Sequence, residues 1–239
     1  MERERTNHMN LAIVGYGKMG RRIEQLAPDY GFTVGLKIGR DDGAADRFTK
    51  EKFQGIDAAV EFSTPAVCLE NAERLAALGV NTVIGTTGWL DRIDHLRGVV
   101  QRSGTALVWG PNFSVGANVF MEIVGKAAQL LAAEADYGAW AWEIHHAAKK
   151  DAPSGTLRNM LREIEKNGYT REVNVASNRA GSQPGTHELG FDSPDDSITL
   201  RHTARSRDGF ARGALRAARW TKGKRGFYEF RDILQELGP

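Results

Sequence analysis

The chain has 239 residues, with 32 Lys and Arg, 30 Asp and Glu, and a formal net charge of +2 at pH 7. A charge so close to balance predicts neither a nucleic-acid-binding protein nor a membrane-surface protein, and no apolar run in the sequence is long enough to cross a bilayer. Cys68 is the single cysteine, so no intramolecular disulfide can form, and we expect a cytoplasmic protein in which Cys68 packs in the core. Residues 1–10 lack the apolar centre of a secretory signal and are expected to be a frayed extension.

A glycine-rich motif follows the first predicted strand. Residues 11–14 are an apolar run, Gly15-Tyr-Gly-Lys-Met-Gly20 comes directly after it, and the next residues have helical spacing. In a strand–turn–helix unit of this kind Gly15 permits the turn, Gly17 lets a pyrophosphate approach the backbone, and Gly20 allows close packing of helix and strand. A purely structural turn is the alternative, but the position after the first strand favours a dinucleotide site.

The end of the second predicted strand, residues 32–38, bears on cofactor preference. A carboxylate there would accept hydrogen bonds from the ribose hydroxyls of NAD, but the chain reads Lys37-Ile-Gly-Arg40. Without an acid to repel it, a 2′-phosphate could bind Arg40, with Lys37 as a helper. Asp41 and Asp42 follow closely and could take the place of the acid. NADPH is therefore the expected cofactor, and NADH the alternative.

Strands and helices alternate further along the chain, with strands expected at residues 58–62, 81–84 and 105–109. This alternation predicts an open parallel sheet, and ligands of such sheets bind beyond the carboxyl ends of the strands. Turn chemistry alone would explain each of the polar loops after these strands, but their shared edge favours a cofactor site. The residues expected to bind the cofactor are Gly15, Tyr16, Gly17, Lys18, Met19, Gly20, Lys37, Arg40, Ser63, Thr64, Gly85, Thr86, Thr87, Gly110, Pro111, Asn112 and Phe113.

From residue 115 the pattern is that of a second domain. The elements expected here are a helix over residues 115–135, a strand running into His145, a helix to residue 166, and strands near residues 171–177, 186–191 and 197–204. Such a series predicts an α+β domain with a mostly antiparallel or mixed sheet. The expected fold class is therefore α/β, with a Rossmann-like dinucleotide-binding domain and a second α+β domain that carries a mixed sheet.

The densest polar cluster of the sequence lies in this second domain. Residues 143–156 read Glu-Ile-His-His-Ala-Ala-Lys-Lys-Asp-Ala-Pro-Ser-Gly-Thr, between the predicted strand and the predicted helix. Amides at a helix start favour an anion such as a carboxylate, and imidazole and ammonium groups can exchange protons with a ligand. A histidine pair at a strand end is more often structural, and an Asp-x-x-Ser pattern is usually just a helix cap. The convergence of these features with a dinucleotide loop predicts an active site.

The C-terminal part is basic, with nine Lys or Arg and one acid in residues 201–225. Arg212, Arg216 and Arg219 share one side of a predicted helix, which by default is a solvated face. A nucleic-acid patch is disfavoured because no aromatic residues are interleaved on that side. Arg207 is a candidate to bind an anionic ligand or to contact a neighbouring subunit.

With the glycine loop and the polar cluster both placed, the sequence resembles the dihydrodipicolinate reductases of bacterial lysine and diaminopimelate synthesis, over nearly the whole chain. The specific signature is the cluster at residues 143–156. Supporting motifs are residues 15–20, Gly85-Thr-Thr-Gly88, Asn112-Phe-Ser-Val-Gly-Ala-Asn118, Arg179-Ala-Gly181, Gly185-Thr-His187, and Phe210-Ala-Arg-Gly-Ala214 before Trp220. The position that aligns with a frequent acid of this family is Gly39, which favours NADPH.

The resemblance implies NAD(P)H-dependent reduction of the cyclic imine from 4-hydroxy-tetrahydrodipicolinate to tetrahydrodipicolinate, a small dicarboxylate, without a metal. It implies a dinucleotide-binding domain of residues 1–114 and 206–239, and a catalytic domain of residues 115–205 that joins subunits through its sheet into a homotetramer. By motif position, His145 is the general acid/base and Lys149 the proton donor. The residues expected to bind substrate are His146, Ser154, Gly155 and Thr156.

Two other functions stay open on the sequence alone. A related reductase of another imine or amino-acid-derived substrate would have the same cofactor half, and only the signature at residues 143–156 argues against it. A non-catalytic NADPH-binding sensor would have no need of His145 and Lys149 beside an anion site.

Overall fold

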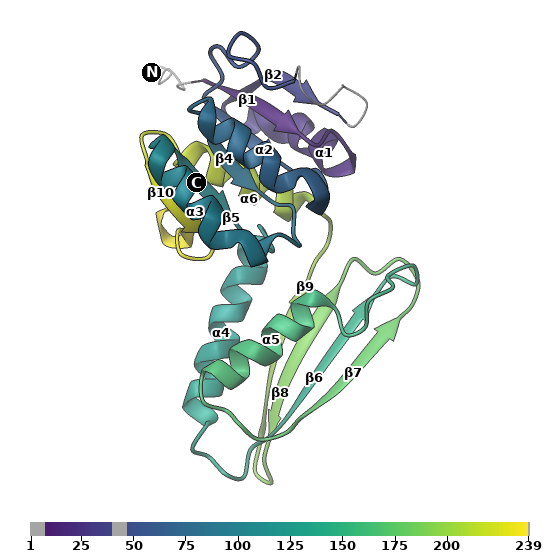
Figure 1. Ribbon diagram of the computed structural model, residues 1–239. Coiled ribbons are helices and arrows are strands. Elements are labelled where there is room, and N and C mark those ends of the chain that lie inside the picture. Colours follow the sequence, from purple (N-terminus) through teal and green to yellow (C-terminus); the bar gives the residue numbers. More distant parts are fainter. Residues whose placement is uncertain (1–7, 40–46, 239) are drawn as a thin grey trace, which may run out of the picture. The chain divides into compact units, whose positions relative to one another are not determined.

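The computed structural model describes residues 8–39 and 47–238. Arg40, Asp41 and Asp42, which enter the argument on cofactor preference, lie outside these residues. By its internal contacts the chain divides into two compact units, Met1–Ser114 together with Asp208–Pro239, and Val115–Arg207 (Figure 1).

The first unit is built on a parallel sheet of six strands. These strands are β1 (Met9–Val14), β2 (Phe32–Ile38), β3 (Ala58–Glu61), β4 (Asn81–Ile84), β5 (Ala106–Trp109) and β10 (Gly226–Glu229), in the order β10-β5-β4-β3-β1-β2. The central strands are almost wholly buried, as short apolar runs between two helical layers should be. The edge strand β10 was not expected from the sequence. Its partner β5 is more than a hundred residues away in the chain, and its half-buried residues show no periodic pattern.

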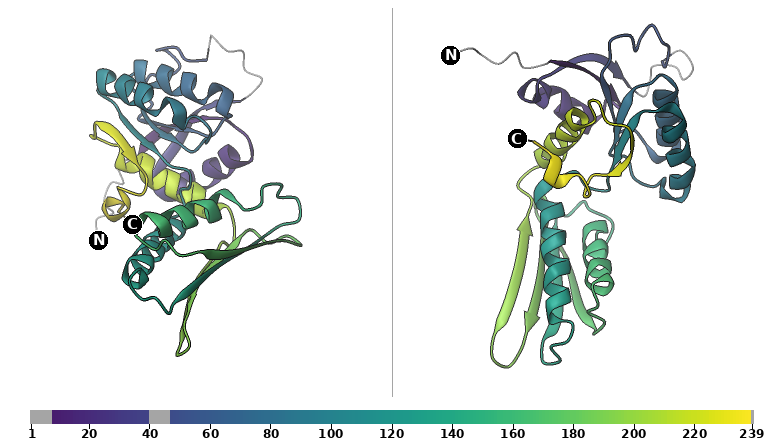
Figure 2. Two further views of the ribbon diagram at one scale, coloured as in Figure 1. Left: turned by 60° about the horizontal axis from the view of Figure 1, so that its bottom comes forward. Right: turned by 90° about the vertical axis from the view of Figure 1, so that its left-hand side faces the viewer.

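Helices cover both faces of this sheet. Helices α2 (Pro65–Ala77) and α3 (Ile93–Ser103) pack on one face, and α1 (Lys18–Leu26) and α6 (Asp208–Trp220) on the other (Figure 2). Short 3₁₀ turns lie at Ala27–Tyr30, Leu90–Arg92 and Leu234–Glu236. Cys68 of α2 is fully buried in an apolar cluster and lies beside the Glu61 carboxylate, and its burial, reinforced by the Glu61 charge, raises the pKa of its thiol. The expected packing role of Cys68 is therefore confirmed.

Two arginines of α6 bind backbone carbonyls. Arg216 donates to the carbonyls of Leu237 and Gly238 at 2.9 and 3.0 Å, and Arg219 donates to that of Tyr30 at 3.0 Å. The basic face of this helix is thus not only solvated, as the default interpretation had it, because it also anchors two irregular segments of the same unit.

The second unit is an α+β structure with a four-stranded mixed sheet. Its strands are β6 (Gly138–His145), β7 (Val173–Arg179), β8 (Thr186–Asp192) and β9 (Ser197–Thr203), in the order β7-β6-β8-β9. Strand β6 pairs parallel with β7, and the other pairs are antiparallel. The prediction of a Rossmann-like unit plus a second unit with a mixed sheet is confirmed.

Two helices, α4 (Val115–Leu131) and α5 (Gly155–Lys166), lie together on one face of this mixed sheet (Figure 2). Helix α4 ends before residue 135, its expected end. The guanidinium of Arg171 donates to four carbonyls at the end of α4 and just after it, those of Leu131, Ala132, Glu134 and Tyr137. The side chain therefore binds carbonyl groups at the helix end that have no intrahelical partner.

Strand β6 has two different faces. Ala139, Ala141 and Glu143 are buried towards the helices, whereas Trp140 and Trp142 point to the opposite face and are half-buried. No other described element of this unit covers that opposite face. In the described part of the chain, no helix is long and apolar enough to span a membrane.

Candidate active site

The carboxyl edge of the parallel sheet borders a pocket of about 520 Å³. Gly15 and Gly17, which follow β1, line it. Gly15 has a φ of +95°, and a Cβ there would lie 2.3 Å from the Phe62 carbonyl oxygen, so only glycine fits. A Cβ at Gly17 would meet nothing within 4 Å, which leaves room for a ligand beside the backbone. Helix α1 begins here with no side-chain cap and no acid in its first turn, an arrangement that suits a phosphate.

Other expected cofactor residues lie around the same edge. Tyr16, Ser63 and Thr64 line the pocket, and Lys18 and Met19 open α1. Two glycines serve packing, because a Cβ at Gly20 would lie 2.5 Å from the Gly15 oxygen and one at Gly85 would lie 2.1 Å from Cε1 of the Phe62 ring.

The loops after β4 and β5 begin at the same edge, because the carboxyl ends of parallel strands lie together. They contain Thr86, Thr87, Gly110, Pro111, Asn112 and Phe113. The side chain of Phe113 is buried and packs on Phe230 with 4.7 Å between ring centroids. The aromatic ring of Phe113 therefore belongs to the core, and only its backbone is placed to meet a ligand.

Lys37, the expected helper for a 2′-phosphate, has partners within the protein. Its Nζ lies 3.0 Å from Oε1 of Glu24, and the hydroxyl of Tyr16 donates to the other oxygen of that carboxylate. Sequence reasoning missed Arg47, which lines the pocket and donates to the carbonyl of Gly39 at 2.9 Å. This contact places a guanidinium at the end of β2, but no local motif links residue 47 to that strand.

A buried carboxylate joins two of the cofactor loops. Glu61, at the end of β3, is 0% exposed. It accepts hydrogen bonds from Ser63, from Asn71 Nδ2 at 3.1 Å and from Thr86 Oγ1 at 2.6 Å. All of these donors are neutral, and they tie the loop after β3 to the loop after β4. The sequence analysis did not single out Glu61, which reads there as one residue of a buried strand.

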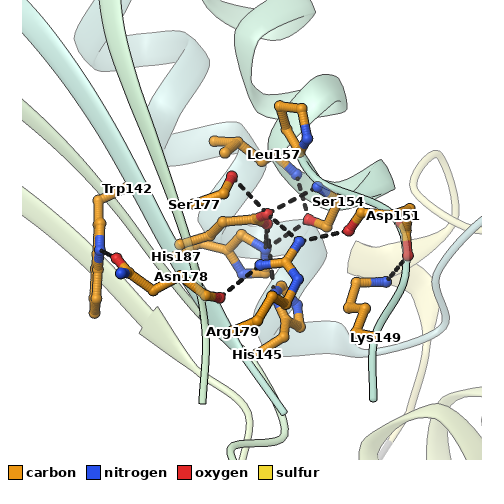
Figure 3. A network of polar contacts seen from close by, with 12 residues as sticks. Trp142, His145, Lys149, Asp151, Ser154, Leu157, Ser177, Asn178, Arg179 and His187 are labelled. Atoms are coloured by element: carbon orange, nitrogen blue, oxygen red, sulfur yellow. Dashed lines mark hydrogen bonds and ion pairs between the residues drawn. The ribbon is translucent and has the colours of Figure 1, made fainter. Parts of the chain in front are cut away.

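The polar cluster of the second unit is centred on Glu143 (Figure 3). Its Oε1 accepts hydrogen bonds from Ser154 N at 2.9 Å, Ser177 Oγ at 2.9 Å and Arg179 Nη2 at 2.8 Å. Burial alone would raise the pKa of Glu143, but these hydrogen bonds outweigh it and hold the pKa at about 2. The carboxylate is therefore ionised at neutral pH.

Two imidazoles face the second oxygen of this carboxylate. Oε2 lies 3.5 Å from His145 Nδ1 and 3.4 Å from His187 Nε2, and the two rings meet edge to face. Burial lowers the pKa of His145, an effect that the Glu143 charge opposes and the Lys149 charge reinforces. Burial and the neighbouring His145 lower the pKa of His187 to about 4, so His187 is neutral at pH 7.

The sheet brings these residues together from separate parts of the sequence. In the register of β6 with β7, Glu143 lies opposite Ser177 and His145 lies opposite Arg179. In the register of β6 with β8, Glu143 lies opposite His187. Sequence reasoning had noted Arg179 and His187 only as parts of supporting motifs, and the cross-strand pairing was the missing information.

The segment from His146 to Thr156 adds an ammonium group and a helix start. Lys149 Nζ donates to Asp151 Oδ1 at 2.7 Å, and this bond lowers the pKa of Asp151. His146 is half-buried, and its carbonyl accepts from the Lys149 amide at 3.1 Å.

Ser154 is the N-cap of α5, where its hydroxyl accepts from Leu157 N at 3.1 Å. Its amide N–H and its hydroxyl are thus both engaged within the protein. The first helical residues are Gly155, which is exposed, and Thr156, which is half-buried. Their amides start the helix, and that of Gly155 already binds an anionic group, the Asp151 carboxylate.

Glu143, His145 and His187 each present one atom within 4.8 Å of the others, the spacing of a three-ligand metal site. The Arg179 guanidinium lies 2.8 Å from the Glu143 carboxylate and already supplies a positive charge that balances it. A divalent cation would be repelled by that guanidinium, so we interpret the group as a hydrogen-bonding network.

The parallel sheet with its glycine turn and pocket is typical of a dinucleotide-binding unit, and the same chain carries an α+β unit with a cluster of titratable side chains. This combination is typical of oxidoreductases that use a nicotinamide dinucleotide. The model of the N-terminus of dihydrodipicolinate reductase matches residues 9–113, and that of the C-terminus matches residues 116–234. The chain therefore belongs to the dihydrodipicolinate reductase family, as its resemblance implied.

Relatives agree with this assignment, and a solved structure shares the fold. The 4-hydroxy-tetrahydrodipicolinate reductase of Christiangramia forsetii is 34% identical over 240 residues, covering 96% of this chain and 99% of the relative. That of Thermosipho africanus is 36% identical over 231 residues, covering 95% and 99%. The structure of a dipicolinate-bound dihydrodipicolinate reductase from Paenisporosarcina sp. TG-14 has the same fold, with a TM-score of 0.81 and 19% identity, covering 95% of this chain and 99% of that one.

Proposed function

We propose that the protein reduces the cyclic imine derived from 4-hydroxy-tetrahydrodipicolinate to tetrahydrodipicolinate with NADPH, in lysine and diaminopimelate biosynthesis. The observation that carries the proposal is the polar cluster: in a chain of this family, His145 and Lys149 lie with the start of α5 in one compact segment. To reduce a diacid imine, the protein must bind the substrate carboxylates and transfer a proton.

Each group has a role in that reduction. When bound, the nicotinamide supplies a hydride to an electron-poor carbon of the conjugated ring, and negative charge spreads into the ring. Lys149 donates the proton that completes the reduction, and His145 acts as the general acid/base. The amides of Gly155 and Thr156, with His146, hold a substrate carboxylate, because a helix start is an electrostatically favourable site for an anion. Ser154, whose amide and hydroxyl bind within the protein, fixes that helix start instead of contacting the substrate.

NADPH is the proposed cofactor because, among the described residues at the end of β2, a glycine stands in the place of an acid and Arg47 supplies a cation. Gly39 stands where an acid would meet the ribose hydroxyls of NADH, and the Arg47 guanidinium is bonded to its carbonyl. A guanidinium can hold a 2′-phosphate with two hydrogen bonds. Arg40 is a second candidate from the sequence.

We further propose a cytoplasmic homotetramer joined through the mixed sheet. The half-buried Trp140 and Trp142 lie on a sheet face that no described element of the same unit covers, and apolar faces of this kind are typical of subunit interfaces. Light scattering on the purified protein gives the mass of the assembly, and a monomer would refute this part of the proposal.

The activity is tested by mixing the protein with NADPH and enzymatically generated substrate, while the absorbance of reduced nicotinamide is followed. Loss of absorbance that depends on the substrate is expected. Turnover with another imine but not with this one would identify a related reductase instead. Tight NADPH binding without turnover on any imine would identify a sensor.

A further inference from the structure

We propose that Glu143 is a positioning residue that fixes the tautomer and orientation of the His145 imidazole, with the proton on Nδ1. Nε2 is then the nitrogen that exchanges a proton during reduction. The role of His145 in catalysis rests on the proposed function, whereas the state of its ring does not.

The Glu143 carboxylate is held in a fixed orientation. The side chain is 0% exposed. Its Oε1 is held by donors from two other elements, the Ser154 amide at the start of α5 and the side chains of Ser177 and Arg179 on β7. Oε2 is thereby aimed at the imidazoles and nowhere else.

Two buried atoms of Glu143 and His145 face one another. Glu143 Oε2 and His145 Nδ1 are both inaccessible to solvent, and neither has a hydrogen-bond partner among the described residues. They lie 3.5 Å apart. Leaving both atoms unpaired is costly, and an Nδ1–H directed at the ionised oxygen satisfies both at once. Catalytic hydrogen bonds are often long in unliganded proteins and shorten when the substrate binds.

The opposite side of the ring lies against the backbone of a glycine. A Cβ at Gly185 would lie 2.8 Å from His145 Nε2. Gly185 also has a φ of +141°, a conformation that other residues rarely adopt. The ring therefore has a carboxylate at Nδ1 and no neighbouring side chain from residue 185 at Nε2.

Other charged and titratable groups around His145 act differently. His187 on β8 also approaches Oε2, at 3.4 Å, but its Nε2 has a second partner in Ser154 Oγ at 3.2 Å. Arg179 on β7 and Lys149 disfavour a positive imidazole, and Asp151 favours it. The charge of His202 on β9 lowers the pKa of His187. Among these groups, Glu143 is the acid with the largest effect on His145.

The experiment is Glu143→Gln, which has the same shape but no charge. The amide oxygen must stay with the three donors at Oε1, so the NH₂ group faces His145 and donates to Nδ1. His145 then carries its proton on Nε2. Nitrogen-15 NMR of histidine-labelled protein without ligands distinguishes the two tautomers, and a His145→Asn variant assigns the signal. Glu188→Gln, which alters the pair between half-buried Glu188 and exposed Arg201 at 2.8 Å, is the matched control.

We expect the Nδ1–H tautomer in the wild type and in the control, and the Nε2–H tautomer in Glu143→Gln. We also expect kcat to fall about a hundredfold to ten-thousandfold in this variant, with the KM for NADPH unchanged. An Nε2–H tautomer in the wild type, or an unchanged tautomer or kcat in a folded Glu143→Gln protein, overturns the proposal. If Glu143→Gln does not fold, the tautomer of the wild type decides.

Failure of the proposed function is seen separately. If the wild type does not reduce the substrate but its His145 has the Nδ1–H tautomer, which reverses in Glu143→Gln, then the positioning role stands and the proposed function is wrong.

Discussion

Arg179 donates to Glu143 at 2.8 Å although 36 residues separate the two in the sequence. Parallel pairing of β6 with β7 makes this contact, because it places Arg179 opposite His145, two residues along β6 from Glu143. The guanidinium thus neutralises a carboxylate that is fully buried, and an isolated carboxylate in that place would be strongly unfavourable.

Replacing Arg179 should weaken the fold and change its response to acid. The pKa of Glu143 falls from 4.5 in the unfolded chain to about 2 in the folded protein. A lowered pKa stabilises the fold above pH 4.5, and this contribution, roughly 3 kcal/mol, is lost as the pH falls towards 2. Arg179→Met should lower the free energy of unfolding at pH 7 by about 3 kcal/mol, because it leaves the acid unpaired. It should also move acid unfolding to a higher pH, as circular dichroism would show. Arg201→Met, at an exposed residue, is the control, and equal acid midpoints for the two variants would contradict the prediction.

Lys149→Met should lower kcat about a hundredfold to ten-thousandfold and leave the KM for NADPH unchanged, since the ammonium group is the proposed proton donor. Steady-state kinetics with substrate and cofactor varied separately measure this. The exposed neighbour gives the control, Lys150→Met. A Lys149→Met enzyme with normal kcat would rule out the donor role.

Arg47→Ala should raise the KM for NADPH about tenfold to a hundredfold and hardly change that for NADH, because one charge-assisted contact to the 2′-phosphate is lost. Initial rates with both cofactors give the two values. Arg40→Ala in the same assay tests whether Arg40, the residue expected from the sequence, also binds the 2′-phosphate. Arg92→Ala, at an exposed residue that does not line the pocket, is the control. An equal loss with both cofactors would show that Arg47 does not distinguish them.

Glu61 offers a matched pair of substitutions. Glu61→Leu leaves Ser63, Asn71 and Thr86 without their acceptor, so we expect a loss of roughly 1–3 kcal/mol in stability and a higher KM for NADPH and NADH alike. Glu61→Gln keeps one acceptor oxygen, and its amide group can donate to the Thr86 hydroxyl, so its effect should be much smaller. Thermal unfolding and kinetics check both, and indistinguishable variants would refute the role of the carboxylate.

The parts of the fold predicted well from the sequence depend on local patterns. The glycine turn of Gly15, its flanking strand and helix, and the helix start at Ser154 each follow from a few consecutive residues, whose backbone requirements are visible in the sequence. The family signature, confirmed by the family models, is local in the same sense.

What the sequence did not reveal depends on register and on distant pairing. Ser177 and His187 reach Glu143 only because β7 and β8 flank β6 in one particular alignment, and a shift of one residue would turn them to the other face. Strand β10 and the contact of Arg47 with Gly39 are also set by tertiary packing. The roles of the individual site residues stay predictions until the variants are measured.

Because Cys68 is buried, the reactivity of its thiol measures local unfolding of the natural protein. The thiol is 0% exposed, its pKa is raised by burial, and the sequence holds no other cysteine. A thiol reagent can therefore modify the chain only when α2 separates from the parallel sheet. The rate of labelling then measures local unfolding of the dinucleotide-binding unit, and no engineered cysteine is needed.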